Sequence, residues 1–179
     1  MSTASDKPPV SGHLWLVGMM GSGKTTVGRA VANRLGMDFL DVDAEVERVA
    51  GQTVAQLFSA GEPEFRRRES AVVISVAGMA PPLVVAAGGG CVVDPENREA
   101  MRRSGSVVWL RADPEELVAR IGPDPGRPLL AGGPPGERLA QLLEERTDAY
   151  EDAASAQVET KGRSLDDVVD EVVRCWTES

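Results

Sequence analysis

The stretch "GMMGSGKTT", residues 18–26, follows the apolar run "HLWLV", residues 13–17, where a strand is expected to turn into a helix. Glycine tolerates positive φ, and because it has no Cβ atom it lets neighbouring backbone N–H groups converge on an anion. Gly18, Gly21 and Gly23 therefore predict a loop that cradles a phosphate group.

The residues after these glycines complete the pattern G-x-x-x-x-G-K-[ST]. In this pattern the lysine, here Lys24, reaches the β- and γ-phosphates, and the hydroxyl of Thr25 turns toward Mg²⁺. A helix predicted over residues 24–36 adds the positive end of its dipole. A chance Gly-rich turn is the alternative, and the strand before it and the helix after it weigh against it. The expected nucleotide contacts are Gly21, Ser22, Gly23, Lys24, Thr25 and Thr26.

The length and charge of the chain narrow the possible partners. Its 179 residues suit one domain that buries a core without disulfides or metals. The 28 acidic residues outnumber the 19 basic ones and give a formal net charge of -9. Such a protein repels polyphosphate backbones and anionic lipids, so we expect neither nucleic acid nor a membrane as a partner.

The cysteines and the first residues bear on the cellular compartment. Cys91 and Cys175 follow no C-x-x-C spacing, so they indicate neither a zinc site nor a disulfide framework. Residues 1–12 lack the basic and apolar segments of a signal peptide, and no apolar run is long enough to span a bilayer. We expect a cytoplasmic monomer with a flexible arm over residues 1–12 and a single domain over residues 13–179.

Strand-like and helix-like segments alternate along the chain, which predicts a parallel sheet covered by helices. Asp113 and Ser164 stand where helix caps are expected before two of the helical segments. The fold class is therefore a three-layer α/β/α domain with an open five-stranded parallel sheet. The expected strands are residues 13–17, 38–41, 83–87, 106–111 and 157–160.

Two segments are expected to build the substrate side of the domain. Residues 43–80, between the second and third strands, have helical character throughout and form an insert where a small kinase would build its acceptor pocket. Residues 122–136, "GPDPGRPLLAGGPPG", contain too many Gly and Pro residues for regular structure. Long loops in compact domains are often lids, and Arg127 stands in the centre of this one. A mobile connector with an incidental arginine is the alternative.

The metal carboxylate is not where it is usually found. Many phosphate-loop enzymes hold Mg²⁺ with an Asp that ends an apolar strand, but "PLVVAAGGG", residues 82–90, ends in glycines. The second strand ends "LDVD", and side-chain alternation predicts that Asp41 and Asp43 lie on the same side, near the phosphate loop. We expect Asp41 to assist the metal through water and Asp43 to face the acceptor. A helix cap alone is the alternative for Asp43.

Two further motifs indicate an anionic acceptor. Residues 88–90 are three glycines, which either permit a tight turn or let the second substrate lie against bare backbone N–H groups. Consecutive helical arginines point in different directions, so only one of Arg66, Arg67 and Arg68 should face inward. A planar guanidinium suits a carboxylate, so this arginine and another from "EERTDAY", residues 144–150, would select an anion.

Taken together and in this order, "GMMGSGKTT", "DVD", "GEPEFRRRE", "AAGGG", "RPLL" and "EERTDAY" resemble the shikimate kinase family over residues 14–175. The resemblance implies a nucleoside-monophosphate-kinase-like phosphate-loop fold with a helical substrate insert and a lid. It implies transfer of the γ-phosphate of ATP, with Mg²⁺, to the 3-hydroxyl of shikimate. The products would be shikimate 3-phosphate and ADP, on the route to aromatic amino acids.

The resemblance also implies roles for individual residues on the acceptor side. Asp43 would hold and activate the attacking hydroxyl. Arg66 and Arg146 would bind the carboxylate of shikimate, and Glu69 would hold Arg66 in place. The residues that would line the acceptor are Gly88, Gly89 and Gly90.

On the nucleotide side, the resemblance places Arg127 on the ATP phosphates when the lid closes. Arg120 would lie against adenine, and Arg163 would border the nucleotide on its other side. Phosphoryl transfer is catalysed mainly by alignment and charge neutralisation, so positive charge from Lys24, Mg²⁺ and Arg127 would complement the alignment by Asp43.

The sequence departs from the family pattern near the base. The family usually has Asp-Thr and then a Pro, whereas "VETKGRSL" has Glu159 and Leu165, which would weaken contacts with adenine more than the chemistry. Cys91, directly after the three glycines, stands either at the pocket wall or as a buried spectator.

Two other functions are open to the sequence. Another small-molecule kinase of this fold, such as a gluconate kinase, would also need arginines for a carboxylate, but the full set of "DVD", "FRRRE" and "GGG" favours shikimate. A nucleotide-binding regulator without an acceptor would leave these motifs unexplained, and no "NKxD" guanine signature occurs.

Overall fold

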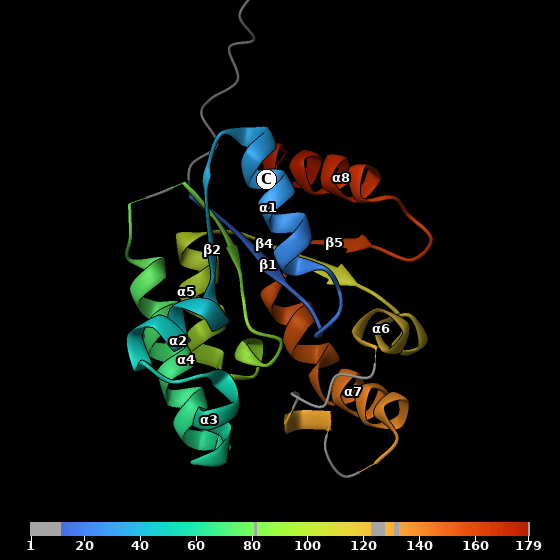
Figure 1. The fold of residues 1–179 in the computed structure, drawn as a ribbon. Helices are drawn as coiled ribbons and strands as arrows, with labels where there is room; N and C mark the ends of the chain where they lie inside the picture. Colours follow the sequence, from blue (N-terminus) through green and yellow to red (C-terminus); the bar gives the residue numbers. More distant parts are fainter. Residues whose placement is uncertain (1–11, 81, 123–127, 131–132, 179) are drawn as a thin grey trace, which may run out of the picture.

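The fold is built on a fully parallel sheet with the strand order β2-β3-β1-β4-β5 (Figure 1). The computed structural model describes residues 12–80, 82–122, 128–130 and 133–178. The ends of the predicted strands differ from the observed ones by at most one residue. The strands are His13–Val17 (β1), Asp38–Asp41 (β2), Leu83–Ala86 (β3), Gly105–Arg111 (β4) and Ala156–Glu159 (β5).

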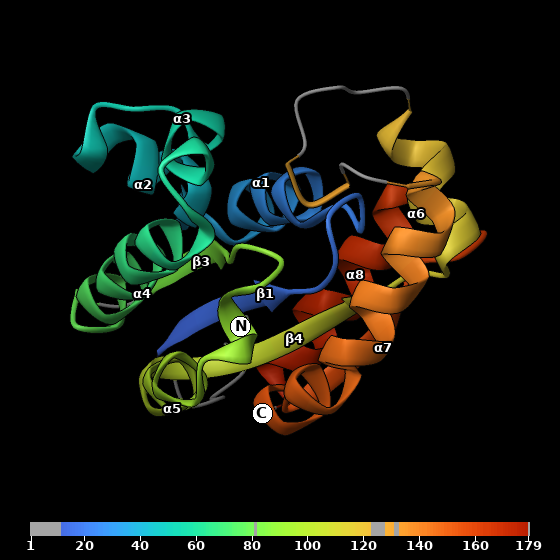
Figure 2. The same cartoon turned by 90° about the horizontal axis from the view of Figure 1, so that it is seen from below.

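Helices cover both faces of this sheet and complete the predicted three layers (Figure 2). One face is covered by α1 (Lys24–Leu35) and α8 (Leu165–Thr177). The other face is covered by α4 (Glu62–Ala77), α5 (Pro95–Ser104) and α7 (Pro135–Ala153).

Strand β1 shows why the sheet is buried on both faces. Leu14 and Leu16 pack under α1 and α8, whereas Trp15 and Val17 face the opposite core. The strand is central, and all five strands end at the same edge of the sheet. In open parallel sheets this edge is where ligands bind.

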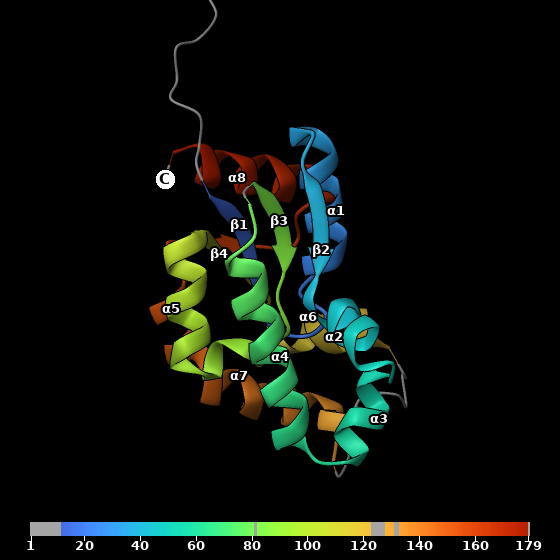
Figure 3. The ribbon, with the colours of Figure 1, turned by 90° about the vertical axis from the view of Figure 1, so that its left-hand side faces the viewer.

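Three helices connect β2 to β3: α2 (Val42–Ala50), α3 (Val54–Ser59) and α4. Figure 3 shows α2 and α3 beyond the ends of β2 and β3. Helix α2 starts directly after β2 because the Asp41 carboxylate accepts hydrogen bonds from the N–H groups of Asp43 and Ala44, at 3.0 and 3.3 Å. Asp43 thus belongs to a helix, so strand alternation was the wrong reason for placing it beside Asp41. The cap-only alternative for Asp43 is wrong as well, since Asp41 is the cap.

The remaining elements are α6 (Pro114–Ile121) and the short 3-10 turns η1 (Cys91–Val93) and η2 (Pro128–Leu130). Helices α5 and α7 were not predicted from the sequence, and α7 begins at Pro135, inside the loop predicted over residues 122–136. Much of that loop, including Arg127, lies outside the described residues. Within the described ranges, the structure contains no helix with the length and apolar character needed to cross a membrane.

Candidate active site

The loop between β1 and α1 is held to Lys24 by hydrogen bonds from the lysine ammonium group to loop carbonyls. Gly18, Gly21 and Gly23 have φ values of 145°, 79° and 95°, which residues other than glycine rarely adopt. Nζ of Lys24 donates to the carbonyl oxygens of Gly18 and Met19, both at 2.9 Å. The ammonium group therefore lies over the loop, beside the N-terminus of α1, where first-turn N–H groups have no partner within the helix.

Thr25 and Asp41 join this loop to the end of β2. Oγ1 of Thr25 donates to Oδ2 of Asp41 at 2.7 Å. Mg²⁺ prefers such oxygen ligands, and in nucleotide sites it is usually bound by one or two protein groups together with phosphates. In the described part of the chain, no cluster of three or more His, Cys, Asp or Glu residues could hold a metal alone. The Thr25 and Asp41 pair therefore fits a magnesium ion that arrives with a nucleotide.

A cavity of about 530 Å³, the nucleotide cavity, lies over this loop. Ser22 does not line it, because its side chain is buried and its Oγ lies against Gly18. The structure therefore brings the expected phosphate contacts together, except that Ser22 does not line the cavity. The predicted residues that line the cavity are Gly21, Gly23, Lys24, Thr25, Thr26, Asp41, Asp43, Gly89 and Arg120.

The two arginines predicted beside the base occupy different positions. Arg120 of α6 lines the nucleotide cavity and donates to the side chain and the carbonyl of Thr160, at 3.0 and 3.3 Å. Arg163 is exposed in the loop before α8 and donates to the carbonyl of Asp167 at 2.9 Å. Leu165, where the family has a proline, is 44% exposed at the start of α8. The structure therefore brings Arg120, but not Arg163, into the nucleotide cavity.

A second cavity of about 150 Å³, the acceptor cavity, lies between the helical insert and α7. Phe58 and Phe65 lie in one wall of this cavity, with their ring centroids 4.5 Å apart. The guanidinium carbon of Arg66 lies 5.9 and 5.3 Å from these two ring centroids, close enough for cation–π attraction. The cavity is lined by Met20, Asp43, Val54, Phe58, Phe65, Arg66, Glu69, Gly89, Gly90, Leu129 and Arg146.

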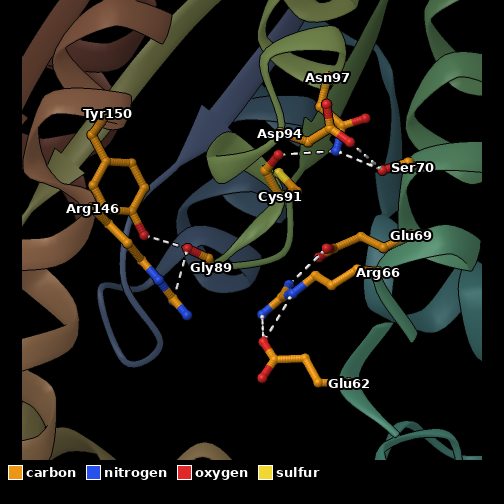
Figure 4. Close-up of polar contacts among 10 residues, drawn as sticks. All are labelled: Glu62, Arg66, Glu69, Ser70, Gly89, Cys91, Asp94, Asn97, Arg146 and Tyr150. Carbon is orange, nitrogen blue, oxygen red and sulfur yellow. Dashed lines mark hydrogen bonds and ion pairs between the residues drawn. The ribbon is translucent and has the colours of Figure 1, made fainter. Parts of the chain in front are cut away.

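Arg66 is the one arginine of "FRRRE" that lines this cavity, in agreement with the prediction that one of the three faces inward. Its Nη1 donates to Glu69 at 2.7 Å, and its Nε and Nη2 donate to Glu62 at 3.2 and 3.1 Å (Figure 4). Arg67 and Arg68 both pair with Glu64, and none of these three side chains lines the cavity. Two carboxylates therefore fix the guanidinium of Arg66 from its own helix.

Glu69 is a buried carboxylate directly behind the acceptor cavity. Its side chain is 1% exposed, and Oε1 has no hydrogen-bond partner among the described residues. Burial raises the pKa of Glu69, the neighbouring Asp43 raises it further, and Arg66 opposes both. A Cβ atom at Gly88 would collide with Oε1 of Glu69 and would lie 3.0 Å from Oδ1 of Asp43. Gly88 therefore makes room for both carboxylates and does not itself line the cavity.

Of the other two glycines, Gly89 lies between the arginines of α4 and α7 (Figure 4), and Gly90 follows it in the chain. Arg146 is 5% exposed, and its Nη1 donates to the carbonyl of Gly89 at 3.2 Å. Tyr150 donates its hydroxyl to the same carbonyl. A Cβ atom at Gly90 would collide with the guanidinium of Arg66. The absence of side chains here thus lets two guanidinium groups approach the same short segment from opposite sides.

Asp43 lies where the two cavities meet, because it lines both of them together with Met20 and Gly89. Its side chain is open to the cleft but surrounded by protein atoms, and this desolvation raises the pKa of Asp43. The negative charge of Asp41 raises it further, whereas Lys24 and Arg66, on the two sides, lower it. A carboxylate is thus placed between the glycine-rich loop with its lysine and the cavity lined by two arginines.

An outer cavity of about 710 Å³ opens beyond the two arginines and shares part of their wall. Leu129 separates it from the acceptor cavity and lines both. Arg138 of α7 donates to the carbonyl of Leu129 at 3.2 Å and so ties this segment to the helix. The outer cavity therefore adjoins the acceptor cavity across residues that line both.

Sequence reasoning missed the aromatic wall and the role of Tyr150. A signal was present for the tyrosine, since Arg146 and Tyr150 are four residues apart and share one helix face. Cys91 is buried and lines none of the three cavities described above, which favours the spectator alternative. Burial also raises the pKa of the Cys91 thiol well above its ordinary value.

Comparisons with known proteins agree on one family. A family model described as shikimate kinase matches residues 20–177. A shikimate kinase from Symbiobacterium thermophilum is 50% identical over 164 residues, which cover 90% of this chain and 94% of that one. The solved structure of a shikimate kinase from Acinetobacter baumannii in complex with shikimate has a TM-score of 0.87 at 36% identity and covers 92% of each chain. A gluconokinase from Sinorhizobium meliloti has a TM-score of 0.61 at 19% identity, over 94% of this chain and 93% of that one, which shows a shared fold alone.

Proposed function

The chain belongs to the shikimate kinase family, and we propose that it transfers the γ-phosphate of ATP to the 3-hydroxyl of shikimate. The products are shikimate 3-phosphate and ADP, on the route to aromatic amino acids. The observation that carries the proposal is the position of Asp43, which lines both the nucleotide cavity and the acceptor cavity. We place the reaction in the cytoplasm, where the two free cysteines stay reduced.

Arg66 and Arg146 are proposed to bind the carboxylate of shikimate. An arginine has five N–H donors, and Arg66 uses three of them on Glu62 and Glu69, which leaves two for a ligand. Arg146 uses one donor on Gly89. Two guanidinium groups on opposite sides of the triple glycine would hold the ring in one orientation, with Gly89 and Gly90 as its backbone support and Gly88 making room for Glu69 and Asp43.

Asp43 is proposed to accept a hydrogen bond from the attacking hydroxyl, to align its oxygen and to take its proton. A raised pKa makes a carboxylate a better base near neutral pH. Lys24 would stabilise the negative charge that builds up on the phosphate oxygens during transfer. Thr25 and Asp41, the latter through water, would hold Mg²⁺, which neutralises charge on the β- and γ-phosphates when it is bound.

The other proposed nucleotide contacts follow from the family. Gly21, Ser22, Gly23 and Thr26 would contact the phosphates, and Arg120 and Arg163 would border the base. Arg127 would add positive charge from the lid, a role that stays a prediction because this residue lies outside the described ranges. We likewise propose the single domain over residues 13–179, with an acceptor insert over 43–80 and a lid over 122–136. The monomeric state and the lack of nucleic acid or membrane partners stay predictions.

The test is phosphate transfer measured by coupled ADP release, with Mg²⁺, ATP and either shikimate or gluconate. We expect ADP release when shikimate, but not gluconate, is the acceptor. The product should show a phosphate monoester on the shikimate ring by ³¹P NMR, and adding EDTA should abolish turnover. Faster turnover with gluconate would contradict the proposal. ATP hydrolysis that no acceptor stimulates would favour the regulator without an acceptor.

A further inference from the structure

The carbonyl group of Gly89 is held from α7 by two donors, Nη1 of Arg146 at 3.2 Å and the hydroxyl of Tyr150 (Figure 4). Tyr150 is fully buried, and its ring stacks on Trp109 of β4 with ring centroids 5.2 Å apart and planes 17° apart. The sheet therefore fixes the position of this hydroxyl. Burial also raises the pKa of Tyr150, so the group stays protonated and remains a donor at neutral pH.

The peptide bond that follows this carbonyl joins two glycines. Glycine has wide backbone freedom, so a peptide group between two glycines can rotate unless its polar atoms are held. A peptide group is planar and trans, so the carbonyl of Gly89 and the N–H of Gly90 point in opposite directions. Because the carbonyl points to α7, the N–H of Gly90 points away from that helix. Fixing the carbonyl therefore fixes the direction of the N–H.

This N–H has no hydrogen-bond acceptor in the part of the chain that the structure describes. The N–H of Gly89 likewise has none among the described residues. Both glycines line the acceptor cavity. A buried N–H without a partner is costly, so an N–H in this position is suited to a ligand oxygen.

Two donors on one carbonyl also matter for Arg146. If Arg146 were the only partner of Gly89, turning its guanidinium toward a ligand would leave a part-buried carbonyl without a hydrogen bond. With the hydroxyl of Tyr150 in place, the carbonyl keeps one partner whatever Arg146 binds. With Tyr150 holding the carbonyl of Gly89, Arg146 can bind a ligand without also having to satisfy that carbonyl.

We propose that Tyr150 is a positioning residue for the acceptor: its hydroxyl holds the Gly89–Gly90 peptide so that the N–H of Gly90 faces the acceptor and Arg146 can bind the acceptor's carboxylate. The proposal rests on the proposed function, because it names the ligand of this cavity as the phosphate acceptor. It assigns no covalent step to Tyr150, which acts through Gly89, Gly90 and Arg146.

The first test is Tyr150→Phe, which keeps the stacked ring and removes the hydroxyl. We expect the KM for shikimate to rise about tenfold, the cost of one buried hydrogen bond, while the KM for ATP stays unchanged. The matched control is Thr147→Val, one turn earlier on α7, which removes a hydroxyl that donates to the carbonyl of Leu143 at 2.7 Å. This control should leave both KM values unchanged. Equal rises in the two KM values for Tyr150→Phe, or a lower melting temperature with unchanged KM values, would overturn the proposal.

The second test needs no turnover. In protein labelled with ¹⁵N-glycine and free of substrate, Tyr150→Phe should shift the amide signal of Gly90, whereas Thr147→Val should not. Signals of distant glycines such as Gly36 and Gly51 serve as references. An unshifted Gly90 signal would overturn the positioning role even if the protein phosphorylates shikimate. A shifted signal in a protein that does not phosphorylate shikimate would keep the peptide contact and refute the proposed function instead.

Discussion

The nucleotide half and the acceptor half of the site are built in different ways. The nucleotide half comes mainly from residues 18–26, one continuous loop whose shape depends on its own glycines and on Lys24. The acceptor half combines side chains from α2, α4 and α7 with the glycines after β3, so it exists only when these helices pack on the sheet. A continuous loop can be recognised from spacing, whereas an assembled pocket depends on the whole fold.

This difference predicts two kinds of failure. Changes in the loop remove charge at the reacting phosphate and should lower kcat. Changes in the acceptor half alter how a ring is held and should raise the KM for shikimate first. A loop variant that mainly raises the KM for shikimate, or an acceptor-half variant that mainly lowers kcat, would contradict this division.

The largest effect is expected for Lys24→Ala. Removing a positive charge aimed at the transferred phosphate should lower kcat about 10²- to 10³-fold. The fold should persist, because removing this half-buried side chain costs charge and alignment but little packing. Steady-state kinetics measure the loss, and thermal unfolding checks the fold. Near-normal kcat in a folded variant would mean that the loop does not act on the reacting phosphate.

Arg146→Ala should give the next largest effect, on the opposite half. Loss of a charge-assisted contact with the acceptor carboxylate costs about 1.5–3 kcal/mol, which is roughly a 10- to 100-fold rise in the KM for shikimate. The KM for ATP should change little. Steady-state kinetics of this variant give the KM for shikimate and the KM for ATP. An equal rise in both would mean that Arg146 does not act specifically in the acceptor half.

The nucleotide half was predictable because its determinants are local. The glycines, the lysine and the hydroxyl of the loop are separated by fixed short spacings, and each spacing has a physical reason. Buried parallel strands appear as short apolar runs between turns, so the strand ends were also predictable to within one residue.

The acceptor half was predictable only in part, and mainly through family resemblance. Tyr150 and Gly89 are 61 residues apart, and no local spacing indicates that a hydroxyl on α7 meets a carbonyl after β3. Helix α5 was missed although Asp94 caps it with a 2.8 Å hydrogen bond to the N–H of Glu96. The position of Asp43 was anticipated for the wrong reason, since the cap at Asp41 starts a helix before alternation can apply.

Gly90→Ala tests the acceptor half without removing any functional group. A methyl group there would collide with the guanidinium of Arg66, so this side chain must move away from its two glutamates. We expect the KM for shikimate to rise about tenfold, a loss of about 1.4 kcal/mol. Gly78→Ala is the matched control, because its nearest neighbour would lie 3.5 Å from the new Cβ atom. A normal KM for Gly90→Ala would show that Arg66 does not need this position.

The smallest expected effect is on stability, at the junction of the two halves. Desolvation by the surrounding protein atoms, together with the charge of Asp41, raises the pKa of Asp43 above its ordinary value of 3.8. Between the ordinary and the raised pKa, the folded protein binds more protons at this site than the unfolded chain does, so the free energy of unfolding falls as the pH rises through that window. Above the window the ionised carboxylate is a cost, which Asp43→Asn should remove.

In metal-free buffer, Asp43→Asn should therefore be more stable than the unchanged protein at pH 7.5, by less than about 1 kcal/mol because water in the cleft screens the charge. The gain should shrink as the pH falls toward the ordinary pKa of 3.8, because protonation of the folded carboxyl removes the electrostatic cost. Urea unfolding at several pH values measures it, and Asp38→Asn, at the other end of β2, controls for the change in net charge. A gain that does not depend on pH, or one matched by Asp38→Asn, would mean that Asp43 carries no local electrostatic cost. A pH-dependent gain confined to Asp43 would identify the junction as a place where stability is given up for a carboxylate suited to accept a proton.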